Sequence, residues 1–276
     1  LGFNSYGYGC PDDLKDDLPY MESWNDLVPI SLYRNDDTFR YVDIFDSIVQ
    51  ESIETKVRNK CIANRNNPNL IGYMWTDLPT WTLENKHNTN WVDFCRQLPD
   101  SAPGKIEYVQ YLQAQYDSDI DSFNELYLTG MGDWESLLSY SFASVPDKSE
   151  IRNDDLAFLR MIARQYYTLL GNATREYDPS HLVFGDRLLF SLVVDEVIEE
   201  MLPHVDAIAI QPNYNAGFPD ETYQHLHSLT NKPILICDYA IRFPEEGKDI
   251  NNVTAPDQET AGKDYNDYLQ EAISTS

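Results

Sequence analysis

The stretch "NLIGYMWTDLPTW", residues 69–81, ends a short apolar run on a single acidic residue. Residues 70–75 carry only apolar or aromatic side chains and one glycine, which is typical of a strand that is covered on both faces. The stretch therefore predicts a buried parallel strand that brings Asp77 to the edge of a sheet. The alternative is that Asp77 or Thr80 caps a helix that begins after Pro79.

Other apolar runs of similar length alternate with segments that have the helical period. The expected strands are residues 1–6, 28–33, 70–75, 182–184, 207–210 and 233–237. The expected helices are residues 43–60, 106–116, 120–127, 132–138, 155–177, 195–202, 222–229 and 259–273. Repeated alternation of strands and helices predicts a parallel α/β fold. We expect it to form one domain over residues 1–276.

Polar and aromatic residues gather directly after the expected strands, where a (β/α)8 TIM barrel carries its active site. These groups read "NSYGY" (4–8), "YRND" (33–36), "WTDLPTW" (75–81), "GDR" (185–187), "QPNYN" (211–215) and "DYAIRF" (238–243). A doubly wound sheet is less well supported, because the first strand lacks the glycine spacing of a phosphate-binding turn. Only six strands are visible, so we expect the first and last barrel strands to be missing from this chain. The alternative is that two strands lie in segments assigned to loops.

The composition excludes several classes of function. The chain has 276 residues, and 46 acidic against 20 basic residues give a net charge of -26, which argues against binding to nucleic acids or anionic membranes. No apolar run approaches the roughly 18 residues that span a bilayer, and no signal peptide is visible. The four cysteines are widely spaced and no histidine follows an expected strand, so we expect free thiols and no metal site.

Five stretches resemble, in the same order along the chain, the β-agarases of glycoside hydrolase family 50, which are TIM barrels of clan A. They are residues 43–81, 105–127, 175–188, 204–214 and 231–243, for example "REYDPSHLVFGDRL" and "NKPILICDYAIRF". The resemblance implies a hydrolase, secreted or periplasmic, that acts on a β-linked galactan of the agarose type or a related polysaccharide without a cofactor. It also implies an acid/base residue after the fourth strand and a nucleophile at the end of the seventh. The chain fits this count if residues 1–6 form the second strand.

The family pattern is altered at the expected catalytic positions. Leu78 stands where the resemblance places the acid/base glutamate, and leucine cannot transfer a proton. We therefore expect Asp77 to be the proton donor, Asp238 to be the nucleophile or general base, and Asp186 to be a reserve acid. Carboxyl groups roughly 5–5.5 Å apart would give retention of configuration, whereas about 6.5–9.5 Å would leave room for a water molecule and give inversion.

Strand alternation predicts where these side chains point. Asp77 has the parity of Tyr73 and Trp75, so the three are expected to share one face of their strand. Asp186 and Arg187 are adjacent, so one is expected to reach the site and the other the packing behind it.

Residues near the strand ends are candidates for binding a sugar, either as aromatic platforms or as partners of hydroxyl groups. They are Trp75, Trp81, Tyr214, Asn213, Gln211, Arg187, Asn4, Tyr6, Tyr33 and Arg34. The alternatives are that the tryptophans fill the core and that Asp238 forms an ion pair with Arg187 or Arg242.

Two other functions remain open: a non-catalytic carbohydrate-binding barrel, because of Leu78, and a scaffold protein, because of the missing strands. An enzyme should keep both carboxylates in one open cleft with a raised pKa. A binding protein should keep the aromatic platforms but pair its acidic residues with arginines, and a scaffold should fill the cleft.

Overall fold

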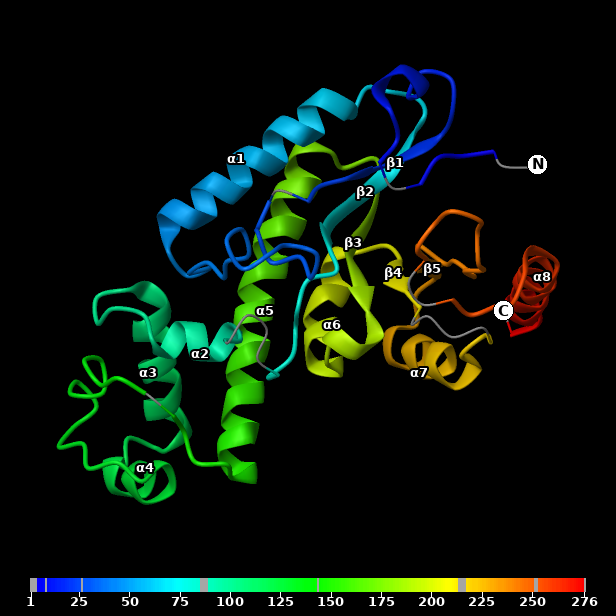
Figure 1. The fold of residues 1–276 in the computed structure, drawn as a ribbon. Coiled ribbons are helices and arrows are strands. Elements are labelled where there is room, and N and C mark those ends of the chain that lie inside the picture. Colours follow the sequence, from blue (N-terminus) through cyan, green and yellow to red (C-terminus); the bar gives the residue numbers. More distant parts are fainter. Residues whose placement is uncertain are drawn as a thin grey trace.

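A computed structural model of the chain describes residues 4–7, 9–25, 27–84, 89–142, 144–212, 217–250 and 253–275. Within these ranges a parallel sheet alternates with helices (Figure 1). The strands are β1 (Tyr20–Ser23), β2 (Leu70–Asp77), β3 (Leu182–Leu189), β4 (Ile208–Gln211) and β5 (Ile234–Ile236). The α-helices are α1 (Ser47–Asn64), α2 (Trp91–Arg96), α3 (Pro103–Gln115), α4 (Ile120–Tyr127), α5 (Ser149–Tyr177), α6 (Asp195–Met201), α7 (Asp220–Thr230) and α8 (Gln258–Thr275). Short 3-10 helices cover Asp12–Leu14, Phe190–Leu192 and Leu202–His204.

The strands lie side by side in the order β1-β2-β3-β4-β5, and every described pair is parallel. The order never reverses, as it would at the centre of a doubly wound sheet. Helix α1 packs against α5, α5 against α6, and α6 against α7, so these helices follow the strands in sequence (Figure 1). Tyr6 adds a parallel bridge to Tyr20 at the β1 edge. The arrangement is an arc of a TIM barrel, which confirms the expected fold class.

The two faces of the arc differ in how they are filled. The larger apolar cluster joins the sheet to its helices and includes Tyr73, Trp75 and Tyr166. A second, smaller cluster consists of Met74, Phe184, Ala207, Ala209 and Cys237, and it forms the inner surface of the arc. The residues at the carboxyl ends of the strands lie at one edge of this inner surface.

Helix α5 is the longest element, with 29 residues, and it precedes β3 directly. It stops at Asp178 because Pro179 follows, and the residue before a proline avoids the helical conformation. Since β3 returns antiparallel to α5, the first turns of the helix lie near the carboxyl ends of the strands. These turns border the loops that follow β2 and β3.

Helices α2, α3 and α4 form an insertion between β2 and α5, at the lower left of Figure 1. Buried charges tie it together: Arg96 forms an ion pair with Asp93 (2.6 Å) and another with Asp155. The Nζ atom of buried Lys105 donates to the carbonyls of Arg96 (2.6 Å) and Tyr140 (3.0 Å). Burial lowers the pKa of Lys105 to about 8.

Most expected elements are confirmed, with shifted ends, but two are wrong. Of the expected strand at residues 1–6, residues 4–6 show only the bridge of Tyr6 to Tyr20, and residues 1–3 lie outside the described ranges. Residues 28–33 form no strand: Pro29 interrupts them, and Ser31 instead makes an antiparallel bridge to Pro79. The strand at this place of the sheet is β1, which the sequence analysis missed because it has only two apolar residues before Glu22. The expected helix at residues 132–138 is a series of bends and turns. The expectation of one domain over residues 1–276 stays a prediction.

Candidate functional site

A bulge in β2 directs Asp77 toward the inside of the arc. The register of β2 and β3 runs from Tyr73 opposite Val183 to Asp77 opposite Arg187, and it shifts on both sides of Met74. Such a shift inserts an extra residue into a strand and re-aims the side chains that follow it. Asp77 and Met74 therefore line the same cavity.

Tyr73 and Trp75 lie on the opposite face of β2, against α5 and the residue that follows it. The Tyr73 hydroxyl donates to Asp178 (2.6 Å), and the Trp75 indole donates to Thr174 (3.1 Å). The prediction that Asp77 shares their face is wrong, because simple alternation does not continue through the bulge.

Gly185 permits the matching irregularity in β3. Its φ of 74° lies in the left-handed region, and a Cβ atom there would be 2.8 Å from both Met201 Sδ and Val205 Cγ1. Beyond Gly185, Arg187 faces the cavity and Asp186 faces the helices. The expectation that these two neighbours point to opposite sides is confirmed.

Asp186 is fully buried between the sheet and α5, and it does not line the cavity that holds Asp77. Its carboxylate accepts hydrogen bonds from the Thr76 backbone (2.9 Å) and the Tyr167 hydroxyl (2.9 Å). It also accepts from the Tyr166 hydroxyl and the Trp81 indole, both at 3.3 Å. Burial raises the pKa of Asp186 to about 6. The expected reserve acid is thus a packing residue that anchors the end of β2.

One arginine joins the two carboxylates of the candidate site. Asp77 Oδ1 accepts from Arg187 Nε at 2.7 Å and also contacts Nη2. Asp77 is 7% exposed and Arg187 is 5% exposed, so this ion pair is buried. Asp238 Oδ2 lies 3.9 Å from Arg187 Nη1, and the Asp238 side chain is 54% exposed. The guanidinium of Arg187 therefore lies between a buried carboxylate and an exposed one.

These three residues line a cavity of about 550 Å³ at the carboxyl ends of β2, β3 and β5. Its walls also include Gly7, Met21, Tyr33, Met74, Leu235, Ile236 and Cys237. Among the described lining residues Tyr33 carries an accessible aromatic ring, since its side chain is 61% exposed. Burial raises the pKa of the Cys237 thiol to about 12, so this floor residue is neutral. The cavity combines an apolar floor with three charged groups.

The backbone is strained where both carboxylates leave their strands. Leu78 has a φ of 43° and Asp238 a φ of 51°, which few residues other than glycine adopt. The Leu78 amide donates to the Arg187 carbonyl (2.9 Å), and the Leu78 side chain is buried. The residue at the expected acid/base position thus holds the turn and presents no acidic group to the cavity.

The two tryptophans expected as sugar platforms are both fully buried. The ring of Trp81 is 5.0 Å from that of Trp91 at 13° between planes, and Trp75 packs on Tyr167. The structure therefore places these indoles in the core, which was the alternative, and both contact Tyr167 of α5.

The other expected binding residues that the structure describes do not line the cavity. Gln211 is buried, and its Oε1 has no hydrogen-bond partner among the described residues. Arg34 donates to the Asn25 carbonyl (3.0 Å). Asn4 is exposed, whereas Tyr6 takes part in the bridge to β1. Asn213 and Tyr214 lie outside the described residues.

The described ranges also bear on metal sites and on helices that could cross a membrane. They contain no group of three or more His, Cys, Asp or Glu side chains placed to hold a metal ion. None of their helices combines the length and the apolar character that a membrane crossing requires.

Comparison with known proteins gives a match in fold. No family model matches the chain, and no curated protein matches its sequence. Among solved structures, an exo-β-agarase superimposes with a TM-score of 0.82 at 21% identity, over 99% of this chain and 38% of that one. An agarase, AgWH50C, gives 0.79 at 20% identity, over 98% and 39% of the two chains. A β-galactosidase from the haloarchaeon Halorubrum lacusprofundi gives 0.50 at 16% identity, over 82% and 35%.

The chain thus spans well under half the length of each of these proteins. At such identities the likeness concerns the fold. The agarase resemblance expected from the sequence is confirmed at that level: the chain has the fold of part of an agarase-type TIM barrel.

Proposed function

We propose that this chain provides a carbohydrate-binding site of a glycosidase-type barrel, and that its ligand is a β-linked galactan of the agarose type or a related polysaccharide. The proposal rests on one observation above all: Asp77 and Asp238 share Arg187 at the mouth of a cavity in an agarase-type fold. We also propose that the protein is secreted or periplasmic, since a polysaccharide of this kind is met outside the cytoplasm.

The chemistry of the cavity suits a sugar. Carboxylate oxygens accept hydrogen bonds from sugar hydroxyls, and a guanidinium donates to hydroxyl oxygens. Asp238 and Arg187 supply both kinds of group within about 4 Å of each other. The exposed ring of Tyr33 offers a flat apolar surface for the C–H face of a pyranose. An apolar floor with a few convergent polar groups is the usual composition of a small-molecule site.

The same geometry favours binding over catalysis. A buried carboxylate that is bonded to a guanidinium directs its oxygens to that partner and not to the leaving group of a substrate. Asp77 is in that position, and Leu78 beside it cannot replace it. Inversion would need a water between the two carboxylates, where the guanidinium of Arg187 lies instead.

Hydrolysis is the second candidate, because Asp238 is exposed at the end of β5, where the agarase resemblance implies a nucleophile. In this mechanism Asp238 acts as nucleophile or general base and Asp77 as proton donor. Asp77 must then leave Arg187 when the substrate binds and take up a proton.

One experiment separates the two candidates. The protein is incubated with insoluble agarose, and both the sedimented protein and the newly formed reducing ends are measured. A binding protein is retained and releases no reducing ends, and Asp238→Asn lowers its retention. The control is Asp100→Asn, an exposed aspartate outside the cavity lining. Reducing ends that disappear in Asp238→Asn would establish hydrolysis, and a wild-type protein that is not retained would refute the proposed ligand.

A further inference from the structure

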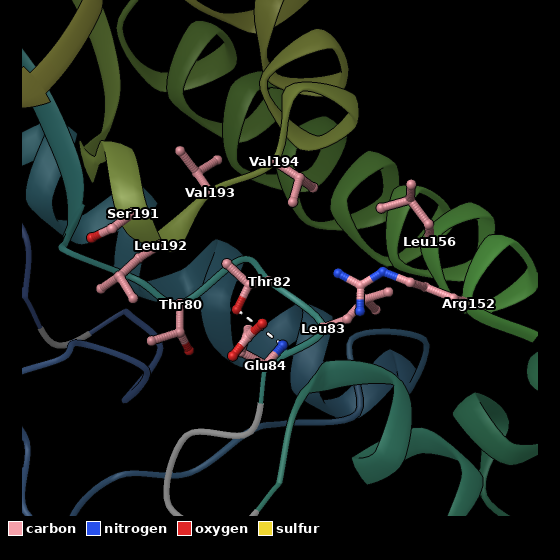
Figure 2. Close-up of a pocket in the computed structure, with 10 residues that line it drawn as sticks. All are labelled: Thr80, Thr82, Leu83, Glu84, Arg152, Leu156, Ser191, Leu192, Val193 and Val194. Atoms are coloured by element: carbon pink, nitrogen blue, oxygen red, sulfur yellow. Dashed lines mark hydrogen bonds between the residues drawn. The ribbon is translucent and has the colours of Figure 1, made fainter. Parts of the chain in front are cut away.

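A second cavity, of about 480 Å³, lies between the loops that follow β2 and β3 (Figure 2). The first turns of α5 form its third side. Its lining residues are Thr80, Thr82, Leu83, Glu84, Arg152, Leu156, Ser191, Leu192, Val193 and Val194. None of them lines the cavity that holds Asp77, Arg187 and Asp238.

The walls of this second cavity are held firmly. The Trp81 amide donates to the Leu192 carbonyl (2.6 Å), and the Val194 amide donates to the Trp81 carbonyl (3.2 Å). These bonds join the two loops as a short parallel ladder. The buried indole of Trp81 is in turn bonded to Asp186 and stacked on Trp91. A ligand would therefore meet a preformed surface and lose little free energy in ordering it.

The lining has the composition of a site for an uncharged polyhydroxylated ring. Leu156, Val193 and Val194 give an aliphatic wall, and Thr82 and Ser191 add hydroxyl groups to the lining. The Thr82 hydroxyl accepts from the Glu84 amide at 3.2 Å (Figure 2). Aliphatic side chains pack on C–H groups, while hydroxyls donate to and accept from sugar hydroxyls.

The lining contains one basic residue, Arg152, and one acidic residue, Glu84. Arg152 reaches across from α5 toward Leu83, and the Glu84 carboxylate lies near Thr82 (Figure 2). The two charges balance, so the cavity has no excess of cations to select a phosphate or a sulfate. In a protein with a net charge of -26, this favours a neutral ligand.

The second cavity lies close to the first. Thr80 is only three residues after Asp77, so their Cα atoms are at most roughly 11 Å apart. Likewise Ser191 follows Arg187 by four residues. Both cavities thus lie at the carboxyl ends of the same two strands, β2 and β3.

We infer that the second cavity is a sugar subsite that binds a neutral hexose residue of the same polysaccharide, with Arg152 donating to its hydroxyl oxygens and Glu84 accepting from its hydroxyl groups. The inference rests on the proposed function and extends it to a ligand that is longer than the first cavity alone can hold.

The test is a calorimetric titration with a disaccharide and a hexasaccharide prepared from agarose. The wild type is compared with Arg152→Ala, which removes a donor, and with Ser191→Trp, which fills the cavity from an exposed position. Arg164→Ala is the matched control, since Arg164 is an exposed arginine of the same helix that pairs with Glu200 away from the lining. The wild type should bind the hexasaccharide about tenfold more tightly than the disaccharide, which is about 1.4 kcal/mol.

Both cavity variants should lose most of this gain in affinity and retain the wild-type affinity for the disaccharide, while Arg164→Ala behaves as the wild type. If the variants bind both sugars as the wild type does, or if the wild type binds both lengths equally tightly, the subsite does not exist. Neither result would contradict the proposed binding of sugar in the first cavity. If the wild type binds neither sugar, the proposed function itself fails.

Discussion

Arg187→Met should destabilise the protein strongly, because it leaves the buried Asp77 carboxylate without its ion pair. Asp77 and Arg187 are 7% and 5% exposed, so neither charge is well hydrated. Removing one partner of such a pair costs about 3–5 kcal/mol, mainly because the other charge stays buried. Since Asp77 lines an open cavity, water can reach it in part, and we expect a loss near 3 kcal/mol, at the lower end of this range.

The assay is urea unfolding followed by tryptophan fluorescence, for Asp77→Asn, Arg187→Met and the double variant. The double variant should be more stable than the sum of the single effects implies, by at least about 1.5 kcal/mol, because it leaves no unpaired charge. Arg160→Met is the control: Arg160 is 40% exposed and pairs with Glu200 at the surface, so its loss should cost less than about 1 kcal/mol. Single effects that simply add, or an Arg187→Met variant within about 1 kcal/mol of the wild type, would show that the pair does not act as a unit.

Three other predictions concern residues around the site and in the helical insertion. Burial raises the pKa of Asp186 to about 6, whereas the pKa of an unfolded aspartate is near 3.9. Between these two pH values the native state binds more protons than the unfolded state, so stability falls as the pH rises from about 4 to about 6. Asp186→Asn should remove this fall, about 3 kcal/mol, from unfolding curves at pH 4 and pH 7, and an unchanged pH slope would contradict the assignment. Gly185→Ala should cost about 2 kcal/mol or more, since alanine must adopt a φ of 74° and place Cβ 2.8 Å from Met201 Sδ; a wild-type urea midpoint would refute the tight contact. Burial lowers the pKa of Lys105 to about 8, whereas the pKa of an unfolded lysine is about 10.4, so between these pH values the unfolded chain binds more protons and stability should rise with pH. Lys105→Met should flatten that rise. Parallel curves of stability against pH for the two proteins would contradict this prediction.

The fold class followed from the sequence because two simple signals agreed. Short apolar runs marked β2 to β5, and the helical period marked α1 and α5 to within several residues. The strand β1 was not predicted, because its second half, Glu22–Ser23, is polar and continues no apolar pattern. It is a strand because it pairs with β2. Tertiary pairing decided this element, and a local pattern does not report it.

The site was only partly predictable. That Asp77 and Asp238 meet near the carboxyl ends of their strands follows from parallel topology, and an ion pair of Asp238 with Arg187 was one of the alternatives. The pairing of Asp77 with the same arginine was not foreseen. This ion pair depends on the register shifts in β2 and β3, and Gly185 is the one residue whose type indicates such a shift.

The aromatic residues show the same limit. A tryptophan near a strand end looks the same in sequence whether it faces a cavity or a helix. Trp75 faces α5 with Tyr73, and Trp81 packs on Trp91, so among the described lining residues the accessible ring is that of Tyr33, which follows no described strand. The direction of a side chain after an irregular strand is a tertiary property.

Titration of the agarose disaccharide into the wild type, Tyr33→Ala and Asp238→Asn shows whether the cavity around Arg187 binds sugar. Both residues are exposed, so their variants should fold normally. We expect measurable binding by the wild type and an affinity at least about tenfold lower in each variant. Equal binding by all three proteins would place the sugar elsewhere, and no binding by the wild type would contradict the claim itself.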